Sequence, residues 1–342
     1  MFKRLVGLFV IILMALALYI VFPHKIKRVL YFPQKDSPYF QDYIVMQDIP
    51  LNRFDLFFFK FFDVKKGWVR VDGYVNKIDM FKFALAQKKE KRRVMVAYGG
   101  ELIEEFLEKI AKQANLDKRK LQKIVQKKAK FSEASILAKK YKIPYRIDEE
   151  SVLDYILADT LVRYKKMARD AQLKVDSKEF YQKLIIASII QKETSNSKEM
   201  PLIASVIYNR LQKGLKLQMD ATLNYGKNIH TIIDSKMIKE DNSSYNTYKH
   251  KGLPPKPLAI ISQTALLAAL KPAKSSYLYF VKSGSKHSFS KGYNKHKQKV
   301  RAYKRDLSLK RLLKKEFRRF AYLFAKELKP TIFTIYLPIK TK

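Results

Sequence analysis

Residues 184–194 read LIIASIIQKET and are apolar almost to their end. This stretch is the most informative part of the sequence for the fold. Its length and composition, without Gly or Pro, predict a helix with a buried apolar stripe. Glu193 follows Ile190 and Ile189 by three and four residues, so a helix places all three on one stripe. The stretch therefore predicts a core helix that ends in a partly buried carboxyl group.

Two interpretations of Glu193 are open at this point. Burial disfavours the charged form of a carboxyl, and a carboxyl that stays protonated near neutral pH can act as a general acid. The other interpretation is a helix-terminal glutamate in a surface ion pair with a lysine. Spacing alone favours the ion pair.

A second helix, two polar segments and a proline turn follow. Residues 201–211 (PLIASVIYNRL) predict a helix that begins at Pro201 and is stopped by Gly214. The polar segments 215–226 (LKLQMDATLNYG) and 245–248 (YNTY) offer donors, acceptors and aromatic rings that a sugar ligand requires, although ordinary turns explain them equally well. The rigid proline turn is 252–255 (GLPP).

Upstream, the pattern changes between alternation and helical spacing, in the order strand, helix, strand, helix. This order predicts a small α+β module over residues 67–116. The aromatic stretch before it, residues 31–62, is interpreted as strand-like. The lysine-rich stretch after it, residues 117–142, is interpreted as a linker or an exposed helix. The four patterned segments are 68–73, 80–86, 93–98 and 101–114.

The N-terminal region holds 18 residues without a charge, 5–22, which read LVGLFVIILMALALYIVF. As a helix they are roughly 27 Å long, enough to cross a hydrocarbon core. A cleaved signal peptide with its site at Ala15-Leu16-Ala17 is the competing interpretation. We expect an uncleaved anchor because the apolar run continues past that site. The charges do not set the orientation, because the flank after the run is at least as basic as Lys3 and Arg4 before it. A flank of only four residues, with the mass of the chain downstream, favours a cytoplasmic N-terminus.

The composition is strongly basic, with 70 Lys+Arg against 31 Asp+Glu and a formal net charge of +39. This charge fits nucleic acid, an anionic membrane or polymer, or a plain lysine bias on the surface. The absence of Cys excludes disulfides, thiolate metal sites and a Cys nucleophile. The five histidines show no metal-ligand spacing, so we predict no metal; they are 24, 230, 250, 287 and 296.

The C-terminal region reads as a basic amphipathic helix. Leucines and phenylalanines recur at helical spacing from Leu309 to Leu328, with lysines and arginines between them. Such a helix either packs on the body of the protein or lies on an anionic membrane surface.

In combination, these segments resemble the bacterial endolytic murein transglycosylases of the MltG/YceG-like type. The resemblance is clear over residues 184–300 and fainter back to Gly67. It rests on the order and spacing of blocks: ASIIQKET (187–194), PLIASVIYNRL (201–211), LQMDAT (217–222), YNTY (245–248), GLPP (252–255), LKPAKSSYLYFV (270–281) and HSFS (287–290).

The resemblance implies an α+β fold with a transmembrane helix, a LysM-like module and a mixed α/β catalytic domain. It implies cleavage of the β-1,4 bond between N-acetylmuramic acid and N-acetylglucosamine, without water, to leave a 1,6-anhydro end and so terminate glycan strands. The family's catalytic carboxyl falls on Glu193, which would act first as acid and then as base. No second carboxyl is then needed to activate water.

The resemblance also implies roles for further residues. Asp220 would shape the glycan groove, and no cofactor is expected. His287 would be a groove contact or an ordinary polar turn residue. The candidate glycan contacts are Asn209, Gln218, Asn246 and Tyr248.

The implied location is the cytoplasmic (inner) membrane, with a single pass and the catalytic domain on the periplasmic side. The implied partners are peptidoglycan strands and penicillin-binding-protein synthases, with no nucleic acid; the sequence predicts no oligomeric state. The expected division is a cytoplasmic N-terminus (1–4), anchor (5–22), membrane-proximal segment (23–66), LysM-like module (67–116), linker or helical segment (117–150), catalytic domain (151–300) and basic extension (301–342).

Four positions depart from the family's pattern, namely Gln191, Met219, Ala221 and Lys256. They leave room for a second hypothesis, a degenerate glycan-binding or scaffold protein of the cell-wall synthesis machinery. A membrane-tethered nucleic-acid binder is the third, and it lacks any recognised motif.

Overall fold

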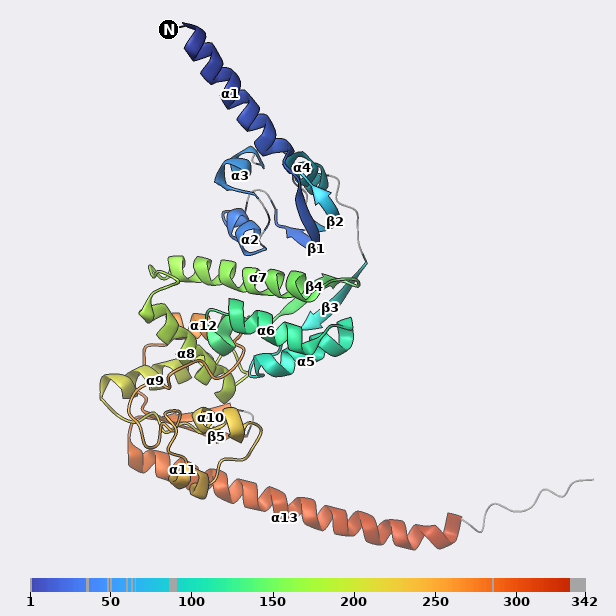
Figure 1. Cartoon of the computed structure of the whole chain (residues 1–342). Helices are drawn as coiled ribbons and strands as arrows, with labels where there is room; N and C mark the ends of the chain where they lie inside the picture. The colour runs from blue at the N-terminus through green and yellow to red at the C-terminus, as the bar shows by residue number, and fades with distance from the viewer. Residues whose placement is uncertain are drawn as a thin grey trace, which may run out of the picture.

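The computed structural model describes residues 2–34, 37–47, 49, 51–59, 61–62, 64, 66–85, 91–284 and 286–332. It is an elongated α+β molecule, with helix α1 (Phe2–Val21) at one end and helix α13 (Tyr293–Ile332) at the other (Figure 1). By length and composition α1 can cross a membrane, and its apolar window over Arg4–Val21 is not covered by the rest of the protein. The folded body lies between these two helices.

The part next to α1 is a two-stranded sheet covered by short helices. Strand β1 (His24–Phe32) pairs antiparallel with β2 (Gly67–Val75), from His24 opposite Val75 to Phe32 opposite Gly67. Helices α2 (Phe40–Met46), α3 (Arg53–Phe59) and α4 (Lys77–Leu85) complete this part. The strand-like interpretation of the aromatic stretch is wrong at α3, where Leu56 and Phe59 share a buried face at helical spacing.

A strand–helix–helix–strand unit follows. Its elements are β3 (Arg92–Val96), α5 (Ile103–Ala114), α6 (Lys118–Lys128) and β4 (Lys140–Pro144), with the 3₁₀ turn η1 (Ser132–Ser135) before β4. Strand β3 pairs antiparallel with β4, whereas β2 pairs with β1. Both strands of the module expected at 67–116 therefore pair with strands outside it.

The segment 117–150, expected as a linker or helical segment, contains helix α6 and strand β4. Its helix α6 buries Leu121 and Val125, and its strand β4 buries Tyr141 and Ile143 in the same cluster as α5. Lysines surround the two buried positions of α6 and obscure the helical spacing in the sequence. Their long side chains stay at the surface, while Leu121 and Val125, four residues apart, point into the core. The boundary expected at 116 falls between two helices that contact each other.

The remaining body is built around helix α8 (Lys178–Glu193). Seven consecutive residues, from Leu184 to Ile190, are buried, so this helix is covered on all sides and not along one stripe only. The other elements are α7 (Glu149–Asp170), α9 (Met200–Gln212), α10 (Asp220–Leu223), η2 (Gly226–Asn228), α11 (Ser235–Glu240), α12 (Gln263–Leu270) and the antiparallel hairpin of β5 (Tyr279–Ser283) and β6 (Lys286–Ser290).

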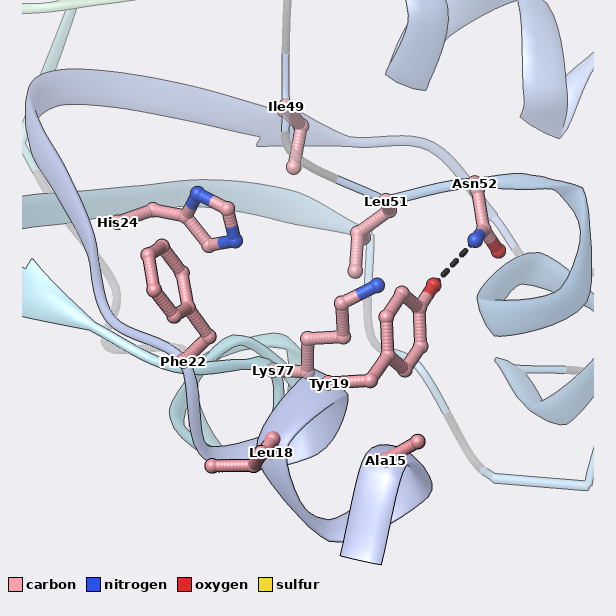
Figure 2. Close-up of a pocket in the computed structure, with 9 residues that line it drawn as sticks. All are labelled: Ala15, Leu18, Tyr19, Phe22, His24, Ile49, Leu51, Asn52 and Lys77. Atoms are coloured by element: carbon pink, nitrogen blue, oxygen red, sulfur yellow. Dashed lines mark hydrogen bonds between the residues drawn. The ribbon is translucent and has the colours of Figure 1, made fainter. Parts of the chain in front are cut away.

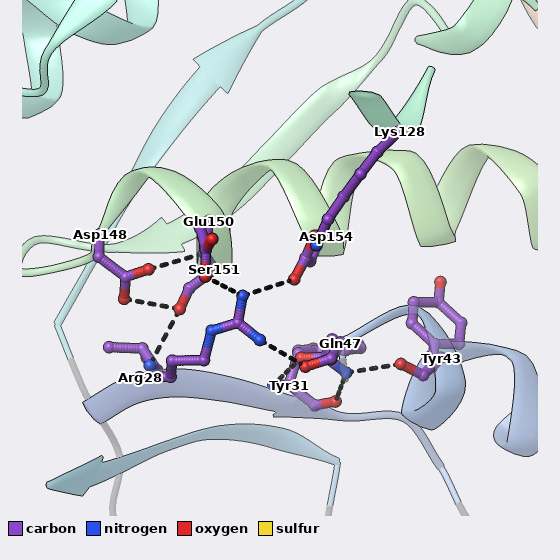
Figure 3. A network of polar contacts seen from close by, with 10 residues as sticks. Arg28, Tyr31, Tyr43, Gln47, Lys128, Asp148, Glu150, Ser151 and Asp154 are labelled. Atoms are coloured by element: carbon purple, nitrogen blue, oxygen red, sulfur yellow. Dashed lines mark hydrogen bonds and ion pairs between the residues drawn. The ribbon is translucent and has the colours of Figure 1, made fainter. Parts of the chain in front are cut away.

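A polar network joins strand β1 to helix α7 (Figure 3). Arg28 reaches from β1 to Glu150 and Asp154 on α7, and it also donates to the Gln47 carbonyl at 2.8 Å. Asp154 is buried, and Lys128 donates to its other oxygen at 2.6 Å. Because a buried carboxylate needs such partners, the network fixes the membrane-proximal part on the rest of the body.

A second polar cluster ties the end of α1 to the body, beside a cavity of about 570 Å³ (Figure 2). The Lys77 Nζ lies 2.6 Å from Asp55 Oδ2 and 3.3 Å from the centre of the Tyr19 ring. The Tyr19 hydroxyl donates to Asp55 and accepts from Asn52. The last turn of α1 is therefore held by hydrogen bonds and a cation–π contact.

Candidate active site

Glu193 is the last residue of α8 and opens into a cavity of about 510 Å³. The cavity is formed by the end of α8, by α10 and the residues after it, and by the turn that follows β3. Its lining is mostly polar, as a site for a hydroxyl-rich ligand requires. The lining residues are Gly99, Gly100, Gln191, Lys192, Glu193, Thr194, Ser195, Asp220, Ala221, Asn224, Thr231 and Ile233.

The pKa of Glu193 is raised from its ordinary value to about 7. Burial is the main cause, since it disfavours the charged carboxylate, and the negative charge of Asp220 adds to it. The backbone N–H of Ala221 and the Lys192 ammonium act in the opposite direction. Among the described residues no Lys, Arg or His nitrogen lies within 4 Å of the Glu193 carboxyl, so the surface ion pair does not form there.

Asp220 lies across the same cavity at the first turn of α10. Its Oδ1 accepts a hydrogen bond of 2.6 Å from the Tyr248 hydroxyl. Burial and this bond to Asp220 raise the pKa of Tyr248, which therefore stays a neutral donor. Glu193 and Asp220 thus form a pair of carboxyl groups in unlike environments.

Lys192 is the cation of the cavity lining. Its Nζ lies 3.2 Å from Asn224 Oδ1, and burial lowers its pKa although neighbouring carboxylates oppose this shift. Asn224 in turn donates to the Asn228 and Thr231 carbonyls, which shapes the loop after α10. The sequence interpretation did not select Lys192 or Asn224, because both lie in segments where lysine and asparagine have many ordinary explanations.

The turn Gly99–Gly100 forms the opposite wall of the cavity and touches Gln191. A Cβ placed on Gly99 would lie 2.5 Å from Gln191 Cδ. Gln191 Oε1 accepts the Ser262 backbone N–H at 3.0 Å. Gln191, one of the departures from the family pattern, therefore joins α8, the start of α12 and the glycine turn.

A second cavity, of about 680 Å³, adjoins the first and shares Gly99 and Gly100 with it. It extends over the surface of α5, where Lys109 Nζ lies 4.5 Å from the centre of the Tyr98 ring. On the same wall His230 Nε2 lies 2.5 Å from Glu105 Oε1. The glycine turn therefore lies between the cavity at the end of α8 and the cavity on α5.

None of the four candidate glycan contacts lines the cavity, and only Tyr248 is bonded to a residue that does. Asn209 donates to the Ser275 and Tyr277 carbonyls at 2.9 Å each and holds the chain that leads to β5. Asn246 is fully buried and donates to the Ile238 and Asp241 carbonyls. Gln218 accepts from Arg210 at 2.5 Å. The structure brings together Glu193 and Asp220 at the cavity, with Tyr248 bonded to Asp220.

His287 pairs with Glu199, the residue before α9. Its Nδ1 lies 2.8 Å from Glu199 Oε2, and its backbone N–H donates to Glu199 Oε1 at 3.1 Å. Glu199 is buried, and neither residue lines the Glu193 cavity. Within the described residues no group of three His, Asp or Glu side chains could hold a metal ion.

The other departures from the family pattern have simple surroundings. Met219 and Ala221 are buried at the start of α10, where apolar side chains fit, and Lys256 is exposed. Ala221 keeps its backbone N–H directed at Glu193.

Comparison with known proteins shows the family to which this architecture corresponds. A family model described as YceG-like family matches residues 51–302. The endolytic murein transglycosylase of Bacillus subtilis (strain 168) is 37% identical over 136 residues, which are 39% of this chain and 37% of that protein. The protein of the same name from Streptococcus pneumoniae (strain D39) is 31% identical over 144 residues, 40% of this chain and 26% of that protein.

The match therefore spans little more than a third of the length of the first of these relatives and about a quarter of the second. The crystal structure of a yceG-like protein from Listeria monocytogenes has the same fold, with a TM-score of 0.51 and 24% identity. That likeness covers 79% of this chain and 97% of the other. Since the family model covers most of the sequence, this chain belongs to the YceG-like family.

Proposed function

We propose that this protein is a membrane-anchored endolytic transglycosylase that cleaves the bond between N-acetylmuramic acid and N-acetylglucosamine in peptidoglycan strands. The main support for the proposal is the environment of Glu193. Its carboxyl lines a polar cavity, and the pKa of this carboxyl is raised to about 7. The relatives from Bacillus subtilis and Streptococcus pneumoniae are named endolytic murein transglycosylase, which supports the substrate class.

In the proposed reaction Glu193 first acts as a general acid. It gives its proton to the glycosidic oxygen while the bond from that oxygen to the anomeric carbon of the muramyl residue breaks. The resulting carboxylate then takes the proton of the muramyl 6-hydroxyl, whose oxygen attacks the same carbon. The 1,6-anhydro ring closes, Glu193 is again protonated, and no water is consumed.

The neighbours of Glu193 would serve this cycle in different ways. The charge of Asp220 helps to keep Glu193 protonated at neutral pH and would stabilise positive charge that develops on the sugar ring. The Tyr248 hydroxyl holds Asp220 in place. Lys192 and Asn224 line the cavity as donors and acceptors for sugar hydroxyls or amides.

The remaining parts of the proposal concern location. Helix α1 would cross the cytoplasmic membrane once with the N-terminus in the cytoplasm, which leaves the cavity on the outer side. There the enzyme would terminate new strands beside the penicillin-binding-protein synthases. An ordered attachment of α1 through Tyr19, Lys77 and Asp55 supports a body held close to the bilayer.

The test is product analysis by mass spectrometry after digestion of uncrosslinked glycan strands by the full-length protein in detergent. We expect 1,6-anhydro-muramyl ends from the wild type and a loss of at least about 100-fold in Glu193→Gln. Glu179→Gln, at the exposed start of the same helix, is the matched control and should keep full activity. Products with free reducing ends would instead mark a hydrolase, and strand binding without cleavage a scaffold protein.

A further inference from the structure

Helix α13 leaves the body a short distance after it begins. Its first turns pack on the β5–β6 hairpin, where the His296 ring stacks on Tyr279 at 5.0 Å and Lys299 Nζ donates to the Phe289 carbonyl at 2.6 Å. From Arg301 onward nearly every described side chain is exposed, and none of the side chains described between 301 and 323 is buried. The family match ends at residue 302, so this exposed part is a feature of the chain beyond it.

The exposed part has two distinct faces. At 100° per residue its leucines and phenylalanines from Leu309 to Leu323 fall on one half of the helix, and most of its lysines and arginines fall on the other half, together with Leu307. The side chains of the apolar half are exposed, Phe317 by 72% and Leu313 by 59%. The apolar face comprises Leu309, Leu312, Leu313, Phe317, Phe320 and Leu323, and the basic face Lys304, Lys310, Lys314, Lys315, Arg318 and Arg319.

The positive charge of this segment indicates which partner can bind its exposed surface. Residues 301–323 contain nine Lys or Arg and two Asp or Glu. A second copy of the helix would bring two strongly positive segments together, and like charges at that spacing repel. An anionic lipid surface satisfies both faces, because the apolar side chains enter the boundary of the acyl chains while the cations meet the phosphates.

Residues 301–323 lie far from α1, and this position indicates which bilayer they can contact. Helix α1, which by length and composition can cross a membrane, lies at one end of the body, and α13 lies at the opposite end (Figure 1). We propose that residues 301–323 of α13 bind a second anionic phospholipid surface, opposite the bilayer that holds α1. The protein would then bridge two membranes through its anchor and its C-terminal helix, and this proposal does not depend on the glycan chemistry.

The test is vesicle bridging by the full-length protein. The protein is inserted through α1 into phosphatidylcholine vesicles, and separate labelled vesicles that contain phosphatidylglycerol are added and recovered by co-flotation. We expect recruitment of the labelled vesicles, reduced several-fold when the salt is raised from about 0.1 to about 0.5 M. Labelled vesicles of pure phosphatidylcholine should be recruited at least tenfold less.

Two variants of unchanged charge separate the faces of the helix. Leu313→Gln/Phe317→Gln removes two apolar side chains and should lower recruitment at least tenfold. Ser308→Gln/Ala321→Gln places the same residue type on the basic half and should leave recruitment unchanged. Equal recruitment by both variants, or none by the wild type, would overturn the proposal. Binding of soluble heparin that survives in Leu313→Gln/Phe317→Gln, without vesicle recruitment, would assign the surface to a polyanion.

Discussion

Gly99 lies so close to Gln191 that a single added methyl group would fall 2.5 Å from the side-chain carbon Cδ. This contact joins the turn after β3 to the last turn of α8, the helix that carries Glu193. Gln191 is fixed there by the Ser262 N–H at 3.0 Å. The shape of the cavity therefore depends on a contact between segments that lie far apart in the sequence.

Gly99→Ala should displace the end of the Gln191 side chain and break its bond to Ser262. We expect a loss of about 1 kcal/mol in the free energy of unfolding and a several-fold loss of glycan cleavage. Thermal unfolding in detergent measures the first effect. Gly292→Ala is the control, since a Cβ there meets nothing within 4 Å.

The pair can be tested further by a double-mutant cycle. Gln191→Ala removes the side chain that the new methyl group would strike, so Gly99→Ala should cost less in its presence. Strict additivity of the two losses would show that the contact does not matter for stability.

Glu193→Gln should stabilise the folded protein at alkaline pH. The pKa of Glu193 is raised to about 7 in the folded state, against its ordinary value of 4.5 when unfolded. Below about pH 4.5 both states hold the proton; above that the unfolded state releases it first, so folding stability falls until about pH 7. We expect the variant to gain about 1–3 kcal/mol over the wild type at pH 8, and less at pH 5.

Melting temperatures at the two pH values measure this gain. Glu179→Gln should show a difference from the wild type that hardly changes between pH 5 and pH 8. A Glu193→Gln curve parallel to the wild-type curve over this range would contradict the raised pKa.

Asp220→Asn should move the alkaline limit of activity to lower pH. The negative charge of Asp220 helps to raise the pKa of Glu193, so its removal lets Glu193 ionise more easily. The fraction of enzyme that carries the acid then falls earlier as the pH rises, with a several-fold loss of kcat/KM at pH 8 relative to pH 5.5. The measurement is a pH–rate profile.

The control for this profile is Asp170→Asn, an exposed carboxylate at the end of α7. It should keep the alkaline limit of the wild type. An unchanged limit in Asp220→Asn would show that burial alone sets the pKa of Glu193.

Glu199→Ala should destabilise the β5–β6 hairpin. Burial opposes the charge of Glu199, but its two contacts with His287 outweigh burial and lower the pKa of the carboxyl. Loss of a buried pair costs about 3 kcal/mol, whereas exposed Glu240→Ala on α11 should change stability by less than about 0.5 kcal/mol. Urea unfolding distinguishes the two outcomes, and equal effects would make the His287 contact unimportant.

The apolar stretch that ends at Glu193 made α8 and its terminal carboxyl predictable, since a run without polar residues has to be covered on several sides. The polar residues nearby were harder to place. Asn209 and Asn246 satisfy backbone carbonyls inside the fold, a use that sequence pattern does not separate from ligand binding. Gly99 and Gly100 follow β3 and are placed at the cavity by contacts with distant segments, among them the bond from the Gly100 N–H to the Ile260 carbonyl, so their role depends on tertiary structure.

The hydrogen bonds between Arg28 and α7 also determine when strand β1 can complete its contacts during synthesis of the chain. Arg28 is made early, yet its partners Glu150 and Asp154 follow more than 120 residues later. Strand β1 can pair with β2 before then, but its arginine stays without these carboxylates until α7 has been synthesised. The region nearest α1 is thus among the first to be made and among the last to be completed, because its final contacts are among the most distant along the chain.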